Sequence, residues 1–516
     1  MIEKYLNNRF STLYLFPFLI GSLTVFTFQP FNFTFLNFII LPLLFYLVVY
    51  IKKKSKSKYR KKPYKKNLLI CGTFFGIGFY LAGIHWIVNS LTFDESFKVF
   101  IPFGLVLIPL FLSLFFSLSF LIVGPFLNLN LGSILIFSAS LSFSDYLRAK
   151  IFTGFPWNLW AYSLSWNLEV IQVLNILGLF AFNLISITIF ILPSVLFFKL
   201  SLSKKLAYLF IMPLILFTFY IYGNHSLNQN EKRLKEIEEK HYIKVISPDF
   251  DLEYGLTDEK ISERLKKLIR ISDPNKNLQT LFIWPEGIFS GYSFEEISNL
   301  KETFKKNFNK NHLILFGINR KSREPQGYFN SLIIVNHRLE IISEYKKQKL
   351  VPFGEFIPLE KILSRIGLKK VTEGQGSFLK GIKQENLIID NLNILPLICY
   401  EVIFTEFVQQ SDKNTNLIIN ISEDGWFGNS IGPYQHFTKG IFRAIEQNSF
   451  LIRSANRGIS AIINNKGEII KKLNLKEAGN IELDVPLIKS SKKTKKDLIF
   501  FILLITYIFV FNFYKK

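Results

Sequence analysis

Three reactive side chains each follow a short apolar run in the second half of the chain. Glu286 ends the stretch LFIWPE, Lys347 lies within EYKKQKLVPFGE, and Cys399 follows the run Ile394–Ile398. Because residues at strand ends face clefts, a Glu, a Lys and a Cys from three such ends could converge. A cysteine nucleophile needs a base to take its proton and a positive group to favour the thiolate and the oxyanion. These residue types therefore indicate covalent acyl chemistry.

The lysine has two candidates on one face of the predicted extended segment. Side chains alternate along a strand, so Tyr345, Lys347 and Lys349 share a face and Lys346 points away, as a solvated charge. Periodicity alone leaves Lys349 as a rival of Lys347. An ammonium about 4 Å from a thiolate is worth roughly 4 kcal/mol at an effective dielectric of 20, at most about three pKa units. We therefore expect the lysine to lower the pKa of Cys399.

The chain has 516 residues, of which 56 are Phe, and its apolar residues gather in the first 223 positions and the last 20. These long, almost uncharged stretches predict about eight membrane-spanning helices. Burial within a large soluble core would need a partner surface for every apolar face, so we disfavour it. The predicted spans are Leu13–Phe28, Phe33–Ile51, Leu68–Ser90, Val99–Val123, Ser133–Tyr146, Ile171–Phe198, Leu206–Tyr222 and Leu498–Tyr514.

The net charge of +23 would by itself suggest a nucleic-acid partner, but its distribution indicates a membrane instead. Ten basic residues and no acid lie in Lys52–Lys66, between the second and third spans. The positive-inside rule places that loop and both termini in the cytoplasm, and residues 224–496 outside. The lysines at 489, 492, 493, 495 and 496 conflict with this orientation, because they flank the last span on its outer side.

Residues 224–496 read as a soluble α/β domain between a bundle of about seven helices, 1–223, and a C-terminal membrane helix with a short tail, 497–516. Strand-like and helical patterns alternate along the domain. Predicted strands are Tyr242–Ile246, Leu281–Trp284, Leu313–Gly317, Ser331–Val335, Ile394–Ile398, Leu417–Ile421 and Ile459–Ile463; predicted helices are Glu259–Ile271, Phe294–Lys306, Glu401–Gln410 and Tyr434–Gln447.

The chain order WPE, YKKQKLVPFGE and ICYE resembles the Glu-Lys-Cys nitrilase, or carbon-nitrogen hydrolase, superfamily. The spans on both flanks narrow the resemblance to the membrane-embedded apolipoprotein N-acyltransferases. GIHW, GFPWNLWAYS, DGWFGNSIGPYQHF and RSANRGISA agree, so the resemblance covers nearly the whole chain. It implies a polytopic α-helical membrane bundle carrying an αββα sandwich domain.

The resemblance assigns Glu286 as general base, Lys347 as the cation that stabilises the oxyanion, and Cys399 as nucleophile. It also implies an orienting role for Glu355, Tyr400 and Glu401. Glu355 could instead be an exposed loop carboxylate, and Tyr400 and Glu401 could be ordinary residues at a helix start.

Four further residues are candidates for lipid or substrate binding: Trp157, Trp426, Phe427 and His436. Each also has a structural explanation. An aromatic belt explains Trp157, as it does Trp86 and Trp160. Packing at a helix start explains Trp426 and Phe427, and a lone histidine such as His436 is usually structural. The six histidines lack metal-ligand spacing, so neither a metal nor another cofactor is expected.

The sequence departs from the family pattern in two places. Glu423 stands where an Asn commonly precedes the Asp, and Ser247-Pro248-Asp249 lacks the usual Gln and Asn. Glu423 therefore adds an acidic group near the expected cleft.

The resemblance implies transfer of an acyl chain from a phospholipid, phosphatidylethanolamine in this family, through a Cys thioester to a diacylglyceryl apolipoprotein. The expected setting is the bacterial inner membrane, as a multi-pass monomer whose catalytic domain is periplasmic. An alternative is a membrane-tethered amidase acting on a small amide or nitrile. A non-catalytic receptor or transporter is disfavoured, because Glu286, Lys347 and Cys399 are all present and intramembrane charges are sparse.

The charge pattern predicts the outcome of topology fusions. Alkaline phosphatase joined after Asn224 should be active, because it should reach the oxidising outer compartment, and a fusion after Lys58 should be silent. Phosphatase activity in whole cells measures both. A silent fusion after Asn224 paired with an active one after Lys58 would reverse the orientation.

Overall fold

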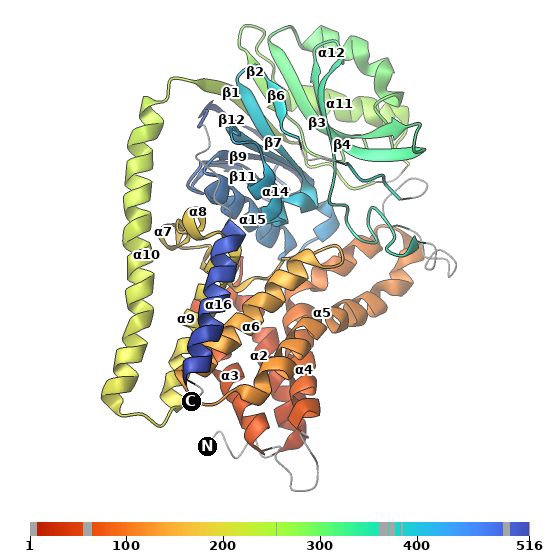
Figure 1. The fold of residues 1–516 in the computed structure, drawn as a ribbon. Helices are drawn as coiled ribbons and strands as arrows, with labels where there is room; N and C mark the ends of the chain where they lie inside the picture. Colours follow the sequence, from red (N-terminus) through yellow and green to blue (C-terminus); the bar gives the residue numbers. More distant parts are fainter. Residues whose placement is uncertain are drawn as a thin grey trace. The chain divides into compact units, whose positions relative to one another are not determined.

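The computed structural model describes residues 8–54, 64–253, 255–360, 370, 377–382, 385–488 and 496–514. The chain forms two compact units (Figure 1). The first comprises residues 1–88, 99–226 and 494–516, and the second comprises residues 89–98 and 227–493. The ten-residue segment 89–98 therefore belongs with the second unit, although its first two residues end the predicted span Leu68–Ser90 and the next predicted span begins at Val99.

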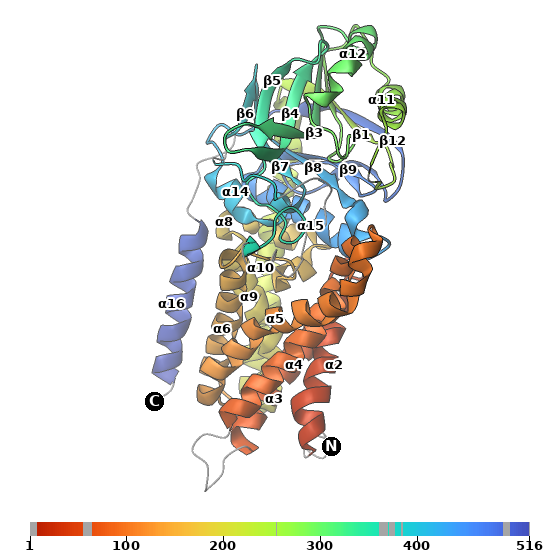
Figure 2. The same cartoon turned by 90° about the vertical axis from the view of Figure 1, so that its right-hand side faces the viewer.

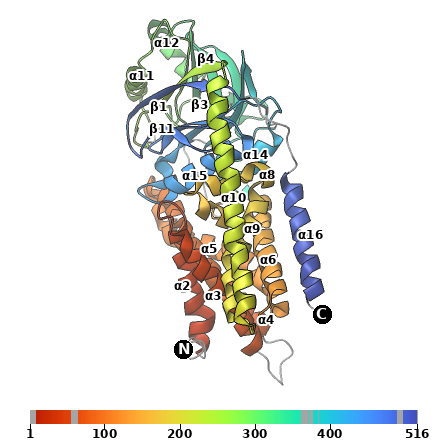
Figure 3. The same cartoon turned by 90° about the vertical axis from the view of Figure 1, so that its left-hand side faces the viewer.

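The first unit is built from helices that run alongside one another (Figures 2 and 3). They are α2 (Phe16–Leu23), α3 (Asn37–Lys54), α4 (Tyr64–Ile84), α5 (Ile101–Val123), α6 (Leu131–Lys150), α7 (Leu168–Ile171), α8 (Leu174–Leu177), α9 (Leu179–Ile191), the first part of α10 (Leu202–Glu236) and α16 (Lys496–Tyr514). Large apolar side chains such as Phe103, Leu107, Phe210 and Phe217 are exposed on α5 and α10. An exposed apolar surface of this kind suits a lipid environment.

Six stretches of helix in the described part of the chain are long and apolar enough to cross a membrane. They are Thr34–Lys54, Tyr64–Thr92, Glu95–Phe126, Leu179–Phe197, Leu202–Glu236 and Lys496–Phe513. The predicted first span is a shorter apolar helix, Ser11–Thr27, and the predicted fifth span forms α6, which is not among the six. The expected count of eight is therefore not reached by this measure.

The predicted span Ile171–Phe198 is interrupted. Short helices α7 and α8 occupy its first part, and the long apolar helix begins only at Leu179. Gly178 has a φ of +75°, outside the helical region, and ends α8. The hydropathy pattern does not reveal this break, since the residues around it are equally apolar.

Small residues allow close packing in this bundle. A Cβ added to Gly78 of α4 would lie 2.1 Å from the carbonyl oxygen of Phe18 in α2, and one added to Gly21 would lie 2.2 Å from that of Phe75. The backbones of α2 and α4 are thus in direct contact, as is common where membrane helices pack through small residues.

The second unit contains two six-stranded sheets, in the orders β12-β1-β2-β3-β4-β5 and β11-β10-β9-β8-β7-β6. Three neighbouring strands in each sheet are parallel, namely β1, β2 and β3 in one and β7, β8 and β9 in the other. The strands are β1 (Lys240–Ser247), β2 (Thr280–Ile283), β3 (His312–Ser322), β4 (Gly327–Asn336), β5 (Ile341–Lys346), β6 (Leu387–Ile389), β7 (Leu392–Ile398), β8 (Leu417–Glu423), β9 (Phe450–Asn456), β10 (Ser460–Ile463), β11 (Ile469–Leu473) and β12 (Gly479–Pro486).

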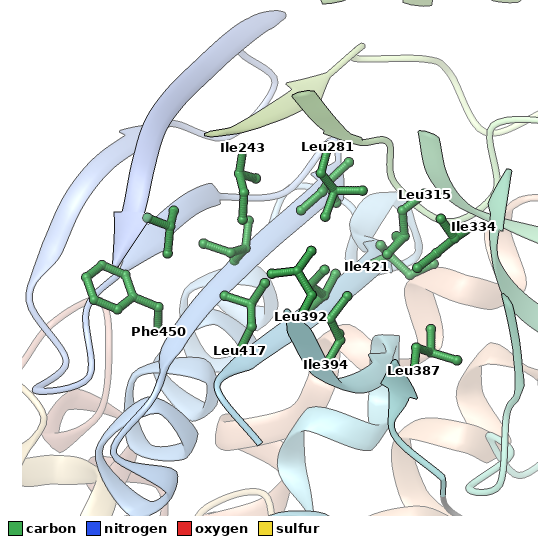
Figure 4. Packing of buried hydrophobic residues seen from close by; sticks show 14 of the residues in the cluster. Ile243, Leu281, Leu315, Ile334, Leu387, Leu392, Ile394, Leu417, Ile421 and Phe450 are labelled. Carbon is green, nitrogen blue, oxygen red and sulfur yellow. The ribbon is translucent and has the colours of Figure 1, made fainter. Parts of the chain in front are cut away.

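The two sheets pack face to face through apolar side chains (Figure 4). Successive side chains of a strand point to opposite faces of the sheet, so one strand contributes to two hydrophobic cores. In β2, Leu281 and Ile283 enter the core between the sheets, whereas Phe282 enters a second core beneath α11 (Asp258–Ser272) and α12 (Lys301–Asn307). Helix α15 (Gly432–Gln447) packs with β9 of the second sheet, and α14 (Thr405–Gln410) packs with α15. The αββα sandwich is confirmed.

All seven predicted strands are present, but β5, β6, β9, β11 and β12 were not predicted. Two predicted helices are shorter than expected, because each begins with 3-10 turns: Glu296–Leu300 precedes α12, and Cys399–Ile403 precedes α14. Helix α10 continues to Glu236, so the domain boundary predicted at residue 223 falls inside it.

The close contact between α2 and α4 predicts that adding one methyl group at Gly78 destabilises the protein. Gly78→Ala should lower the thermal midpoint of the purified full-length protein, because a backbone oxygen cannot move aside and overpacking costs about 1–3 kcal/mol. Gly440→Ala in α15 is the matched control, since its Cβ would lie 3.6 Å from Leu451. Equal midpoints for the two variants would contradict the close packing.

Candidate active site

The predicted reactive residues follow strand ends in both sheets. Glu286 comes three residues after β2, Lys347 directly follows β5, and Cys399 directly follows β7. The parallel strands β7 and β8 end at the same edge of their sheet, where β8 contributes Glu423. Glu286, Lys347 and Cys399 interact electrostatically with one another, so the fold brings the three together.

The ammonium of Lys347 is buried between two carboxylates. Lys347 is 1% exposed, and its Nζ lies 2.9 Å from Glu355 Oε1 and 3.5 Å from Glu286 Oε1. Burial alone would lower the pKa of Lys347, but Glu286 and Glu355 raise it overall. The lysine therefore holds a fixed positive charge, and the buried Glu355 is not an exposed loop carboxylate.

The other two lysines of the segment have different partners. The exposed Lys346 lies over the ring of Phe329, 4.3 Å from its centre. The Nζ of Lys349 pairs with Glu406 Oε1 at 2.9 Å. The geometry therefore favours Lys347 over Lys349 as the lysine beside the cysteine.

Asn330 is a member of this cluster that the sequence analysis missed. Its Nδ2 donates to Glu286 Oε1 at 2.8 Å and to Glu355 Oε1 at 2.7 Å, so one amide bridges both carboxylates. The backbone carbonyl oxygen of Asn330 accepts a hydrogen bond from the backbone N–H of Lys347 at 2.9 Å. Asn330 lies within β4, and no motif in the sequence distinguishes it from other strand residues.

Cys399 begins the 3-10 turn after β7 with a φ of +48°, in the left-handed region that side chains other than glycine rarely adopt. Burial raises the pKa of its thiol, Glu286 raises it further, and Lys347 lowers it without reversing the shift. The ammonium therefore acts in the expected direction, but the expected net lowering of the thiol pKa is wrong, because desolvation outweighs the ammonium. A thiol whose pKa is raised needs a base before it can act as a nucleophile.

The two residues after Cys399 are buried. Glu401 Oε1 accepts hydrogen bonds from the Tyr345 hydroxyl at 2.9 Å and from the backbone N–H of Gln348 at 2.7 Å. Its Oε2 accepts one from the backbone N–H of Ile398 at 2.9 Å. Burial raises the pKa of Glu401 to about 7, although these hydrogen bonds and Lys347 act in the opposite direction. Glu401 thus ties the ends of β5 and β7 together. The Tyr400 ring packs edge-on against Phe404 at 5.1 Å.

Glu423, one of the two departures from the family pattern, is also buried at the site. Its backbone N–H donates to Glu286 Oε2 at 3.1 Å. Its own carboxylate accepts from Gly425 N at 2.8 Å and from Asn456 Nδ2 at 2.7 Å. Burial raises the pKa of Glu423 to about 8, and Glu286 contributes to the increase. In the other departure, Asp249 Oδ1 lies 3.6 Å from Arg457 Nε.

Trp426 and Phe427 lie in a 3-10 turn after β8, and the segment 89–98 packs against this turn within the second unit. Asn89 Nδ2 donates to the Phe427 carbonyl at 2.7 Å, and the Phe93 ring meets Trp426 edge-on at 5.4 Å. Trp426 is half-buried and Phe427 is buried. The turn is therefore held by a segment far from it in sequence.

Two other lipid-binding candidates are enclosed by protein. Trp157 is 1% exposed in the first unit and packs against Trp86 and Phe155, with ring centres 4.7 and 5.8 Å away. His436 of α15 is buried, with one ring nitrogen 3.2 Å from the carbonyl oxygen of Cys399. Of the lysine cluster at 489–496, only Lys496 lies among the described residues.

The shifted pKa of Glu423 predicts a pH dependence of stability. The folded carboxyl keeps its proton up to about pH 8, and the unfolded one releases it near 4.5, so this group makes the free energy of unfolding fall as pH rises between those values. Glu423→Gln should flatten the decline of the thermal midpoint over that window. The exposed Glu302→Gln is the control, and an unchanged slope in Glu423→Gln would contradict the assignment.

Two family models match the chain. Residues 20–192 match the apolipoprotein N-acyltransferase N-terminal domain, and residues 256–492 match carbon-nitrogen hydrolase. Among solved structures, the chain is similar to a CN-hydrolase superfamily protein from Xanthomonas campestris, with 16% identity, a TM-score of 0.35, and coverage of 48% of this chain and 91% of that one. It is also similar to Nit3 from Saccharomyces cerevisiae, with 15% identity, a TM-score of 0.36, and coverage of 48% and 91%.

Curated relatives match almost end to end. The apolipoprotein N-acyltransferase of Rhodopseudomonas palustris is 30% identical over 483 residues, covering 91% of this chain and 88% of the relative. That of Bradyrhizobium diazoefficiens is 29% identical over 482 residues, covering 90% and 88%. Membrane helices, a carbon-nitrogen hydrolase domain and these relatives lead to one conclusion: the chain belongs to the apolipoprotein N-acyltransferase family.

Proposed function

We propose that this bacterial membrane protein transfers an acyl chain from a phospholipid to the N-terminal amine of a diacylglyceryl-cysteine lipoprotein, through a thioester on Cys399. The observation that carries the proposal is the cluster in which the half-buried Glu286 and the buried Lys347 interact with the half-buried Cys399. Family membership supports the choice of substrates. We further propose phosphatidylethanolamine as donor, and a monomer in the inner membrane with cytoplasmic termini and a periplasmic catalytic domain.

In the first half-reaction, Glu286 takes the proton of the Cys399 thiol, and the thiolate attacks the ester carbonyl of the donor. Lys347 and backbone amides stabilise the oxyanion of the tetrahedral intermediate. Glu286 returns the proton to the departing oxygen as the C–O bond breaks. Lysophospholipid leaves, and the acyl group remains on sulfur as a thioester.

In the second half-reaction, the lipoprotein amine attacks the thioester carbonyl. Glu286 accepts a proton from the amine, the C–S bond breaks, and the proton passes to the departing sulfur. Atoms and charge balance over the cycle with no cofactor. A buried Lys347 paired with Glu355 keeps its proton through both steps, so it acts as an electrostatic group and not as an acid.

A membrane bundle suits this reaction. Both substrates carry acyl chains whose removal from the bilayer costs about 0.8 kcal/mol per CH₂. A tethered catalytic unit avoids extracting them fully. An amidase acting on small soluble amides would gain nothing from such a tether, which argues against that alternative.

Intact-protein mass spectrometry after incubation with phosphatidylethanolamine vesicles tests the proposal. Wild type should gain the mass of one acyl chain, and hydroxylamine, which cleaves thioesters, should remove it. Cys399→Ser should show no adduct. Transfer to a lipoprotein peptide by a wild type that never acylates would refute the covalent mechanism.

Lys347 and Lys349, which share a face of the extended segment, provide a matched pair of variants for the same experiment. Lys347→Met should slow adduct formation by about 100-fold or more, the usual cost of losing an oxyanion donor. Lys349→Met should acylate at nearly the wild-type rate, because that ammonium pairs with Glu406 away from the cluster. Equal loss in both variants would argue against Lys347 as the oxyanion-stabilising group.

A further inference from the structure

A buried charged cluster lies directly behind the nucleophile. It consists of Asp424, His436 and Arg453, each at most 1% exposed. Nδ1 of His436 lies 3.0 Å from Asp424 Oδ1 and 3.1 Å from Arg453 Nη2. Arg453 Nη2 also donates to Asp424 Oδ2 at 2.7 Å. None of the three residues has a place in the acyl-transfer steps above.

The other nitrogen of His436 contacts the nucleophile residue itself. Nε2 lies 3.2 Å from the carbonyl oxygen of Cys399. A carbonyl oxygen only accepts hydrogen bonds, so this contact requires a proton on Nε2, with His436 as donor. A neutral ring with this proton has none on Nδ1, which then accepts the hydrogen bond from Arg453 Nη2, and Asp424 orients the ring through Arg453.

This hydrogen bond fixes a planar group next to the reaction. The carbonyl of Cys399 and the N–H of Tyr400 belong to one trans peptide, so they point in opposite directions. A donor that holds the carbonyl therefore also sets the direction of the Tyr400 N–H. It polarises that N–H as well, because linked hydrogen bonds strengthen one another.

The cysteine backbone needs such support. With a φ of +48°, Cys399 is held in a conformation that costs of order 1–3 kcal/mol and persists only where its surroundings impose it. His436 supplies one such restraint, and its partners Asp424 and Arg453 are themselves held in place. Ser422 Oγ donates to Asp424 Oδ1 at 2.6 Å, and Arg453 Nε donates to the Ile459 carbonyl at 3.2 Å.

We propose that His436, oriented by Asp424 and Arg453, is a positioning residue that holds the Cys399–Tyr400 peptide so that the Tyr400 N–H faces the oxyanion. The inference rests on the proposed acyl transfer and adds a function for three residues outside the Glu-Lys-Cys cluster. His436 acts through the protein backbone and does not touch the substrate.

Two amide substitutions test the two ring nitrogens of His436 separately. In His436→Gln the amide nitrogen can reach the place of Nε2 and donate to the Cys399 carbonyl. In His436→Asn the amide reaches only the place of Nδ1, which preserves the contact with Asp424 or Arg453 but loses the donor to the carbonyl. The two variants differ by one methylene group.

Two reactions of Cys399 are measured in the full-length protein. Single-turnover acylation, from phosphatidylethanolamine vesicles and from a p-nitrophenyl acyl ester, passes through an oxyanion. Alkylation by iodoacetamide uses the same thiolate but forms no oxyanion. A merely structural or pKa effect would change both rates, whereas loss of an oxyanion donor should change only acylation.

His436→Asn should acylate about 10- to 100-fold more slowly than wild type with an unchanged alkylation rate, and His436→Gln should recover most of the loss. The inference is overturned if His436→Asn acylates like wild type, if Gln does no better than Asn, or if alkylation falls in parallel. A wild type that accepts the nitrophenyl ester but not the phospholipid would refute the proposed function and leave the comparison between Gln and Asn as the test of this inference.

Discussion

The buried ammonium of Lys347 is the constraint on which the catalytic unit depends. A charge removed from water costs several kcal/mol unless it is paired and hydrogen-bonded. Here Glu286 and Glu355 pair with it, and Asn330 bridges the two acids. Glu286 follows β2, Asn330 lies in β4, and Lys347 and Glu355 both follow β5, so these three strands of one sheet must assemble before the charge is satisfied. The cluster thereby couples the geometry of the site to correct folding of that sheet.

The same enclosed environment determines how the cysteine is activated. Burial and the neighbouring acid raise the pKa of Cys399 despite Lys347, so in the proposed mechanism the thiol keeps its proton until Glu286 takes it. A protonated resting thiol is also less prone to oxidation than a thiolate. Restraints then act on both sides of the nucleophile: Glu401 holds the strand before it, and His436 holds the peptide after it.

The membrane unit meets a different physical requirement. Without water, helix association depends on close packing, and the direct contact of α2 with α4 at Gly21 and Gly78 provides it. The exposed apolar side chains of α5 and α10 account for part of the unusual Phe content. Much of the basic excess lies in the single stretch Lys52–Lys66 of the sequence, where it suits contact with anionic lipid headgroups.

Hydropathy was sufficient to indicate the membrane helices, and short apolar runs indicated strands such as β2 and β7. The resemblance of the spaced motifs indicated the family and singled out Glu286, Lys347, Glu355 and Cys399. Only the folded structure shows that Lys349 pairs elsewhere, that Asn330 bridges two acids, that the thiol pKa rises, and that His436 contacts the carbonyl of Cys399. Each of these depends on distances and burial between residues far apart in the chain, and local patterns carry no information about either.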